Sequence, residues 1–198
     1  MKEFKGKHIF SREIERAIKK EVKPLCDAGR PGWNWRHTLA TVYWMKRLLR
    51  RESGNSRTLI PVMYFHDTGY AGLITKKYSI KDVTDVKKLH AKKSEAYARS
   101  FLRQCEGFTT QEIDCIGHLI RIHDDIPRIV REEPLVFEAD SLGQADYARS
   151  PPSLSPDEGR RWLMMFERNR LPLFYTKTGK DAIQKIWPKT KRVYQKRI

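Results

Sequence analysis

The chain has 198 residues, with 40 Lys and Arg against 24 Asp and Glu, and a formal net charge of +16. This length suits one domain with a sizeable core, and 39% hydrophobic with 32% charged residues is typical of a globular protein. No apolar run approaches the ~18–20 residues that cross a bilayer, and the charged N-terminus excludes a signal peptide. We therefore expect an intracellular, cytoplasmic protein with no membrane partner.

The cysteine spacing and the distribution of charge further limit the classes of protein to which the chain can belong. The three cysteines form no CxxC pair, which argues against a disulfide framework and against a zinc ribbon. Positive charge is concentrated in residues 76–93, with seven Lys against two Asp, and in residues 177–198, with eight Lys or Arg against one Asp. Such a field attracts anionic substrates or nucleic acid, although a solvated basic surface explains the C-terminal part equally well.

The N-terminal part of the chain predicts two helices joined by a loop. Isoleucine and valine recur at helical spacing in residues 11–26, and the Gly and Pro of residues 27–32 then predict a loop. Residues 34–51 have a broad apolar face and place His37 in their first turns. A single histidine on such a face is more often a core residue than a ligand, so its role depends on the rest of the chain.

The next predicted helix ends in a pair of residues that bind metal ions well. This apolar helix is expected to start near Leu59, with Pro61 in its first turn, where proline is tolerated. It runs into His66 and Asp67, and Gly69 follows. The glycine either ends the helix or permits a close approach of two backbones.

Residues 71–89 are the least regular part of the chain. They are expected to form a basic connection with one short helix around residues 83–89. His90 then starts a helix that runs to about Gln104.

A capping box opens the helix after that. Thr109 is followed three residues later by Glu112, and the helix they start ends at His123. His118 lies five residues before His123, so the two side chains point about 140° apart on a helix. We do not expect them to share one site, and His118 is expected to have a packing or supporting role.

The C-terminal part predicts three more helices. Pro134 suits the first turn of the helix that carries Asp140, and Ser155-Pro156-Asp157-Glu158 marks another helix start. A last helix is expected to break at Pro188, which leaves a basic segment over residues 187–198. Because alternating strand patterns are scarce throughout, we expect an all-α fold.

Residues that bind metal ions lie beside these apolar, helix-periodic segments. They are His37 in WNWRHTLA, His66 and Asp67 in YFHDTG, His90 in KKLHAKK, His123 in IRIHDD and Asp140 in FEADSL. The His-Asp pair alone would indicate a helix end with a hydrogen-bonded aspartate. In this order and context, the series resembles the H…HD…H…H…D pattern of the HD superfamily of metal-dependent phosphohydrolases. The resemblance implies an HD-domain helical bundle over residues 33–186, on which the helix and loop of residues 1–32 pack.

The resemblance also implies one or two divalent metal ions as cofactors. It assigns His37, His66, Asp67 and Asp140 to one ion and Asp67, His90 and His123 to the other, with Asp67 as the bridging, catalytic carboxylate. Mn, Fe, Ni, Mg and Zn all suit such a mixed set of ligands. Two ions would lower the pKa of a shared water and neutralise charge on a phosphate ester. The implied reaction is the hydrolysis, by metal-activated hydroxide, of a phosphate ester of a nucleotide or another small anionic metabolite.

Several neighbouring positions have more than one interpretation. Lys92 and Lys93 are candidates to bind a phosphate oxygen of the substrate, although exposed helix lysines explain them equally well. Asp124 is a further ligand, a hydrogen-bonding partner of a ligand, or an acid that solvates a helix end. Tyr70 stands where relatives with HD-x-G-K have lysine, and the lack of acids shortly after the pair argues against an alarmone hydrolase.

Two alternative functions stay open. Some HD-fold proteins use the same six ligands to hold two irons and oxidise a C–H bond with oxygen, and ligand identity does not separate the two classes. The basic C-terminal segment is compatible with a nucleic-acid-associated binding module, although the sequence has no recognisable nucleic-acid motif.

Overall fold

The computed structural model describes residues 10–196. This part of the chain contains ten α-helices and two short 3₁₀ helices, joined by loops. The α-helices are α1 (Arg12–Asp27), α2 (Asn34–Leu48), α3 (Ser56–Phe65), α4 (Ile80–Asp85), α5 (Lys87–Gln104), α6 (Thr110–Ile122), α7 (Ile126–Glu132), α8 (Pro134–Ala145), α9 (Pro156–Asn169) and α10 (Lys177–Gln195). The 3₁₀ helices are η1 (Thr68–Tyr70) and η2 (Leu171–Leu173). These residues contain no strand and form one compact domain, so the all-α prediction is confirmed.

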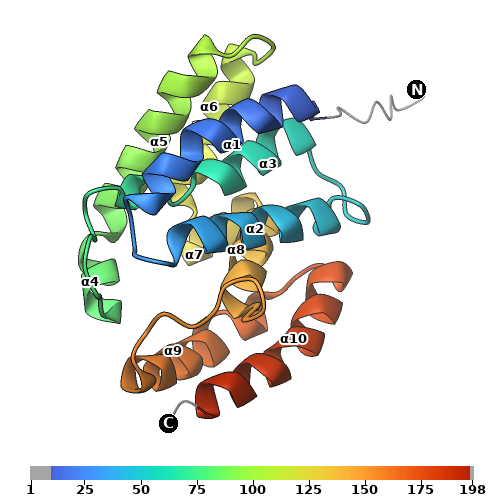
Figure 1. The fold of residues 1–198 in the computed structure, drawn as a ribbon. Coiled ribbons are helices and arrows are strands. Elements are labelled where there is room, and N and C mark those ends of the chain that lie inside the picture. Colours follow the sequence, from blue (N-terminus) through green and yellow to red (C-terminus); the bar gives the residue numbers. More distant parts are fainter. Residues whose placement is uncertain (1–9, 197–198) are drawn as a thin grey trace.

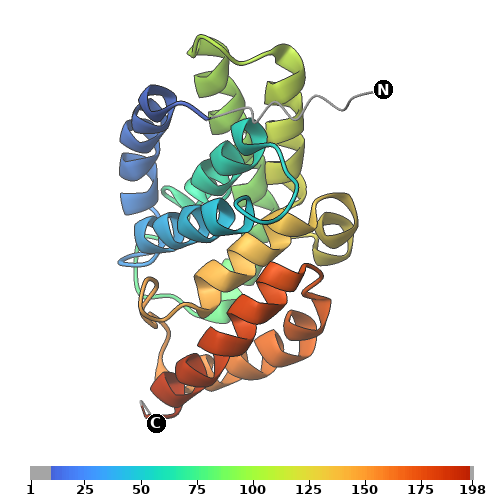
Figure 2. The same cartoon turned by 90° about the vertical axis from the view of Figure 1, so that its right-hand side faces the viewer.

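Helices α2 and α8 cross at the middle of the molecule (Figure 1). Helices α5 and α6 form one end of it, and α9 and α10 form the other (Figure 1, Figure 2). The central crossing is close because α8 presents Gly143 to α2, where a Cβ atom would lie 2.5 Å from Thr41 Cγ2. This packing sets the N-terminal half of α2, which carries His37, beside Asp140 of α8.

The apolar core is continuous from α1 to α10. Fully buried side chains come from α2 (Met45, Leu48), α3 (Met63, Phe65), α6 (Ile116, Ile120) and α8 (Phe137). Burial of each side chain of this size stabilises the fold by about 1.5–3 kcal/mol. Within residues 10–196, no helix combines the length and the apolar character that a bilayer-crossing segment needs.

Local signals set the starts of several helices as predicted. The Thr109 side chain accepts a hydrogen bond from Glu112 N, and Glu112 accepts one from Thr109 N in return. Pro134 lies in the first turn of α8, and Ser155 accepts a hydrogen bond from the backbone of Glu158. Each of these groups satisfies or avoids a backbone N–H that the first helical turn would otherwise leave unpaired.

Two helix boundaries differ from the prediction. Helix α3 begins at Ser56, capped by Asn55, rather than near Leu59, so Pro61 lies inside the helix. The short helix expected over residues 83–89 is instead divided between α4 and the first turn of α5. His90 therefore lies one turn inside α5, where the backbone that holds it is already hydrogen-bonded.

The predicted break at Pro188 is wrong, because α10 continues through it to Gln195. A proline inside a helix costs about 3 kcal/mol. Here Trp187 is buried and stacks on Phe166 of α9, with ring centroids 4.6 Å apart, and this burial offsets the cost. Residues 187–195 are thus part of the last helix, whereas residues 197 and 198 lie outside the described part of the chain.

A buried carboxylate on α8 anchors the start of α10. Glu138 accepts hydrogen bonds from the backbone N atoms of Tyr175 and Thr176, each at 2.7 Å, and from the Thr176 hydroxyl. A negative charge is favoured there because the first backbone N–H groups of a helix point outward and carry partial positive charge. Helix α8 therefore holds the start of α10 through Glu138 and carries Asp140 two residues further along.

Candidate metal centre

The corner after α3 directs two side chains into the interior. His66 is fully buried, and its Nδ1 lies 2.9 Å from the carbonyl oxygen of Met63. Because a carbonyl only accepts, Nδ1 carries the proton and Nε2 presents its lone pair to the site. Thr68 closes the turn by donating to the carbonyl of Phe65 at 2.8 Å, which fixes Asp67 between the two.

Gly69 sets this corner directly against α5. A Cβ atom at Gly69 would overlap the carbonyl oxygen of His90 and would lie 2.7 Å from Ser94 N. The backbone N–H of Gly69 donates to Ser94 Oγ at 2.8 Å. The glycine therefore serves a close approach of two backbones, and this approach brings Asp67 and His90 to the same site.

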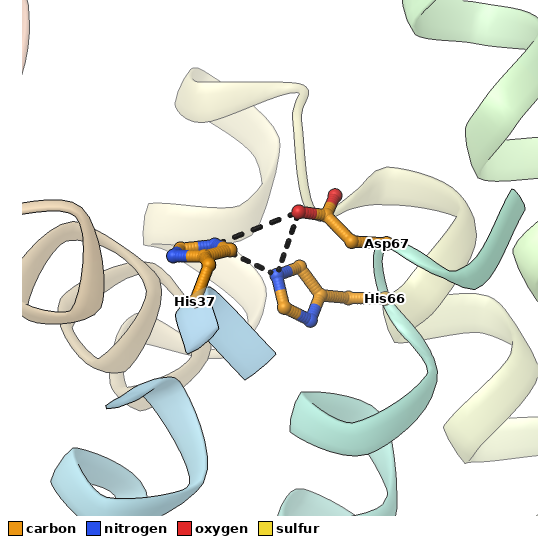
Figure 3. Close-up of side chains that lie close together, drawn as sticks. All are labelled: His37, His66 and Asp67. Carbon is orange, nitrogen blue, oxygen red and sulfur yellow. Dashed lines mark hydrogen bonds and ion pairs between the residues drawn. The ribbon is translucent and has the colours of Figure 1, made fainter. Parts of the chain in front are cut away.

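One group of ligand atoms faces Oδ2 of Asp67 (Figure 3). His37 Nε2 lies 3.6 Å from this oxygen, His66 Nε2 lies 3.5 Å from it, and the two nitrogens are 3.2 Å apart. Asp140 Oδ1 adjoins this group, 3.0 Å from His37 Nε2 and 3.7 Å from His66 Nε2. These four side chains come from α2, the α3 corner and α8.

A second group faces the other oxygen of the same carboxylate. His90 Nε2 lies 3.5 Å from Asp67 Oδ1, His123 Nε2 lies 3.8 Å from it, and the two nitrogens are 3.4 Å apart. Asp124 Oδ2 lies 3.6 Å from His90 Nε2 and 3.7 Å from His123 Nε2. Asp124 therefore lies beside this pair of histidines rather than at a fully solvated helix end.

The protonation of His66, Asp67 and Asp140 suits divalent cations. Burial lowers the pKa of His66 to about 4, which keeps the imidazole neutral at neutral pH. Burial opposes ionisation of Asp67 and Asp140, but Arg30 beside Asp67 and Arg170 beside Asp140 hold the pKa of each carboxyl well below its usual range. Neutral imidazole nitrogens and ionised carboxylates are the forms that bind metal ions.

His123 binds its proton more tightly than its buried position suggests. Burial lowers the pKa of this imidazole, but the charges of Asp124 and Asp67 outweigh that effect and raise the pKa to about 9. Its Nδ1 lies 2.6 Å from the carbonyl oxygen of Ile120, so Nε2 is the atom that faces Asp67. An ion that binds Nε2 must displace its proton, because a side chain binds a metal ion through its deprotonated atom.

Three cationic side chains adjoin the same carboxylates. Arg30 pairs with Asp67 Oδ2 and stacks over the ring of Tyr70 at 4.2 Å. Arg170 Nη1 lies 2.9 Å from Asp140 Oδ2. Lys87 Nζ lies 3.6 Å from Asp124 Oδ1. The sequence did not identify Arg30 and Arg170, because each meets its aspartate only through the tertiary fold.

The two lysines predicted to bind substrate lie elsewhere. Lys92 is exposed on α5, and Lys93 donates to the carbonyl oxygen of Ala71 at 2.9 Å. Neither is among the residues that line the cavity above the ligands. His118 also lies apart from the site, since its half-exposed ring pairs with Glu132 of α7 at 2.6 Å.

Comparison with protein-family models, with curated proteins and with solved structures finds no match. The buried cluster of histidines and aspartates could hold a metal ion, and its arrangement is compatible with an HD-like site. Inferences about function therefore depend on the side chains themselves.

Addition of Mn²⁺ is expected to raise the melting temperature of the protein. The two groups of ligand atoms form only in the folded chain, so an ion that binds them stabilises that state. At 100 times the dissociation constant, the gain is ~2.7 kcal/mol. For a chain of this size, that corresponds to roughly 5–10 °C, measured by thermal unfolding with and without the ion. An unchanged melting temperature with Mn²⁺, Ni²⁺, Fe²⁺, Zn²⁺ and Mg²⁺ would contradict the assignment of a metal site.

Proposed function

We propose that the protein is a metal-dependent phosphohydrolase that cleaves a phosphate ester of a small anionic substrate. The observation that carries this proposal is the position of Asp67, whose two oxygens face two separate pairs of histidine nitrogens. A carboxylate so placed can bridge two ions. When bound, such ions supply a water acidic enough to react at neutral pH and neutralise charge on phosphoryl oxygens.

The charges around the cavity support an anionic substrate. The three carboxylates of Asp67, Asp124 and Asp140 are matched by the three cations Arg30, Lys87 and Arg170, so these six side chains carry no net charge among themselves. Each divalent ion adds two positive charges to this balanced set. An occupied site therefore attracts an anion, and a phosphate ester supplies one.

Arg30 and Arg170 are the side chains best placed to hold the phosphoryl group. Both are largely buried, and both line the cavity while contacting a carboxylate of the candidate site. A guanidinium offers several N–H donors in one plane, so it can keep one donor on its aspartate and turn another to a phosphate oxygen. Donors fixed in this way stabilise charge that develops in the transition state.

The test is hydrolysis of 4-nitrophenyl phosphate by protein purified without chelator. We expect turnover with added Mn²⁺, Ni²⁺ or Mg²⁺, and loss of turnover when a chelator removes the ion. The same ions with the ester alone provide the background rate. Bound iron and oxygen consumption without phosphate release would contradict the proposal and support the oxygenase alternative, which uses the same six ligands.

A further inference from the structure

A cavity of about 220 Å³ lies over the candidate metal centre. Its floor contains His37, Asp67, His123 and Asp140, and its outer part extends between α4 and α9. We propose that the substrate is a phosphate ester whose other end is apolar, with the phosphate on the floor and the apolar group between these two helices. This inference depends on the proposed phosphohydrolase function and narrows its substrate class.

The lining residues divide the cavity into two chemically different parts. All of its acidic side chains, Asp67, Asp124 and Asp140, lie at the floor with the three cations. The outer part contains Ile80 and Val83 from one side and Leu154, Trp162 and Met165 from the other. A polyol such as a sugar needs polar partners for its hydroxyl groups, and unpaired polar groups are costly when buried. The polar side chains there include Tyr78 and Ser153, which bond to each other, and Thr84, which donates to the carbonyl of Ile80. With no carboxylate to accept hydrogen bonds, the outer part suits an apolar group better than a polyol.

The apolar side chains of the outer wall are left partly open to water. Met165 is 47% exposed, and Ile80, Val83, Leu154 and Trp162 are half-buried. Surface of this kind gains from contact with an apolar ligand, because that contact removes it from water. In ligand sites, apolar walls supply most of the contact area while a few polar groups fix the orientation.

The two walls are held in place by hydrogen bonds between their elements. Tyr78 Oη lies 2.6 Å from Ser153 Oγ, and the backbone N–H of Ile80 donates to Glu158 Oε2 at 2.7 Å. These bonds join the start of α4 to the start of α9. The space between the walls therefore exists before a ligand enters, which reduces the ordering cost of binding.

Trp162 is fixed by contacts with other aromatic rings. Its ring stacks on Tyr194, with centroids 5.0 Å apart and an interplanar angle of 24°. It also lies 5.2 Å from the ring of Phe166 and 5.9 Å from that of Trp187. A ring held in this way provides a flat, rigid surface for an apolar group at small entropic cost.

The experiment compares two phosphonates, which have a phosphate-like head but cannot be hydrolysed. Binding of phenylphosphonate and of methylphosphonate to the Mn²⁺-loaded full chain would be measured by calorimetry. We expect phenylphosphonate to bind roughly tenfold or more tightly, since added apolar contact in a pocket is worth at least that factor.

Two adjacent methionines of α9 supply a matched pair of variants. Met165 lines the cavity, whereas Met164 is 63% exposed and lies in a surface groove outside it. Met165→Ala should weaken phenylphosphonate roughly tenfold and leave methylphosphonate unchanged, and Met164→Ala should change neither. Val83→Ala, from the opposite wall, should act in the same direction as Met165→Ala.

The possible outcomes distinguish the apolar-substrate proposal from the proposed phosphohydrolase function. Equal binding of both phosphonates, or an equal effect of the two methionine variants, would overturn the apolar substrate while leaving the phosphohydrolase intact. Failure of the metal-loaded protein to bind either phosphonate or to hydrolyse any ester would overturn both. Because both methionines are exposed, neither variant should impair folding, and circular dichroism checks this.

Discussion

Replacing Asp67 with asparagine is expected to abolish turnover and to remove the metal-induced rise in melting temperature together. Each carboxylate oxygen faces a different pair of histidine nitrogens, and an amide provides only one acceptor and no charge. Removing one hydrogen-bond donor to a developing oxyanion lowers the rate of an enzyme ~10²–10³-fold. We expect removal of a bridging carboxylate to lower the rate by more than this factor. The measurements are phosphate release and thermal unfolding with and without Mn²⁺.

The variant also leaves Arg30 without its buried counter-charge. Removing one partner of a buried ion pair destabilises a protein by about 3 kcal/mol, so circular dichroism must show that the variant is folded. Asp181→Asn is the matched control, because Asp181 pairs with Lys177 on the exposed face of α10. It should leave activity and metal response unchanged. Retention of turnover within tenfold in Asp67→Asn would show that this carboxylate does not bridge the ions.

Gly69→Ala is expected to give the largest loss of stability of any single methyl group added near the site. The added Cβ would overlap the carbonyl of His90, which belongs to the backbone of α5 and cannot rotate away. Overpacking of a well-packed interior costs ~1–3 kcal/mol of stability. We expect the cost of this contact to reach or exceed the upper end of that range. The free energy of unfolding in urea measures the loss, and Mn²⁺ should no longer stabilise the variant.

Ser94→Ala separates the steric effect from the hydrogen bond at the same place. It removes the oxygen that accepts from Gly69 N and adds no atom to the contact. A buried donor left unpaired costs ~1–3 kcal/mol, so this variant should be destabilised less than Gly69→Ala and should keep its metal response. If the two variants lose equal stability and both still bind metal, the close approach is not what holds Asp67 beside His90.

The sequence was most informative where a short stretch of chain determines the structure. The capping box at Thr109 and Glu112 lies within four residues and forms as predicted. The order of the histidines and aspartates predicted a shared site, and the fold does bring His37, His66 and Asp67 together with His90 and His123. Which side chains bind metal ions, and how many ions, stays a prediction.

Features that depend on distant parts of the chain could not be predicted in this way. Arg30 and Asp67 are 37 positions apart, and Arg170 and Asp140 are 30 apart, so no local pattern connects them. The break at Pro188 was predicted from a local rule, but burial of Trp187 against α9 outweighs it. Lys92 and Lys93 were chosen for their nearness to His90 in sequence, but neither lines the cavity.

The balance of three carboxylates against Arg30, Lys87 and Arg170 bears on whether the chain folds before or after an ion binds. An interior with three uncompensated aspartates would resist folding until an ion arrived, as in small domains that are unfolded without their metal. Here the arginines and the lysine already neutralise the aspartates, so the chain can fold without an ion. Any ion that binds this site can then enter or leave without unfolding the chain.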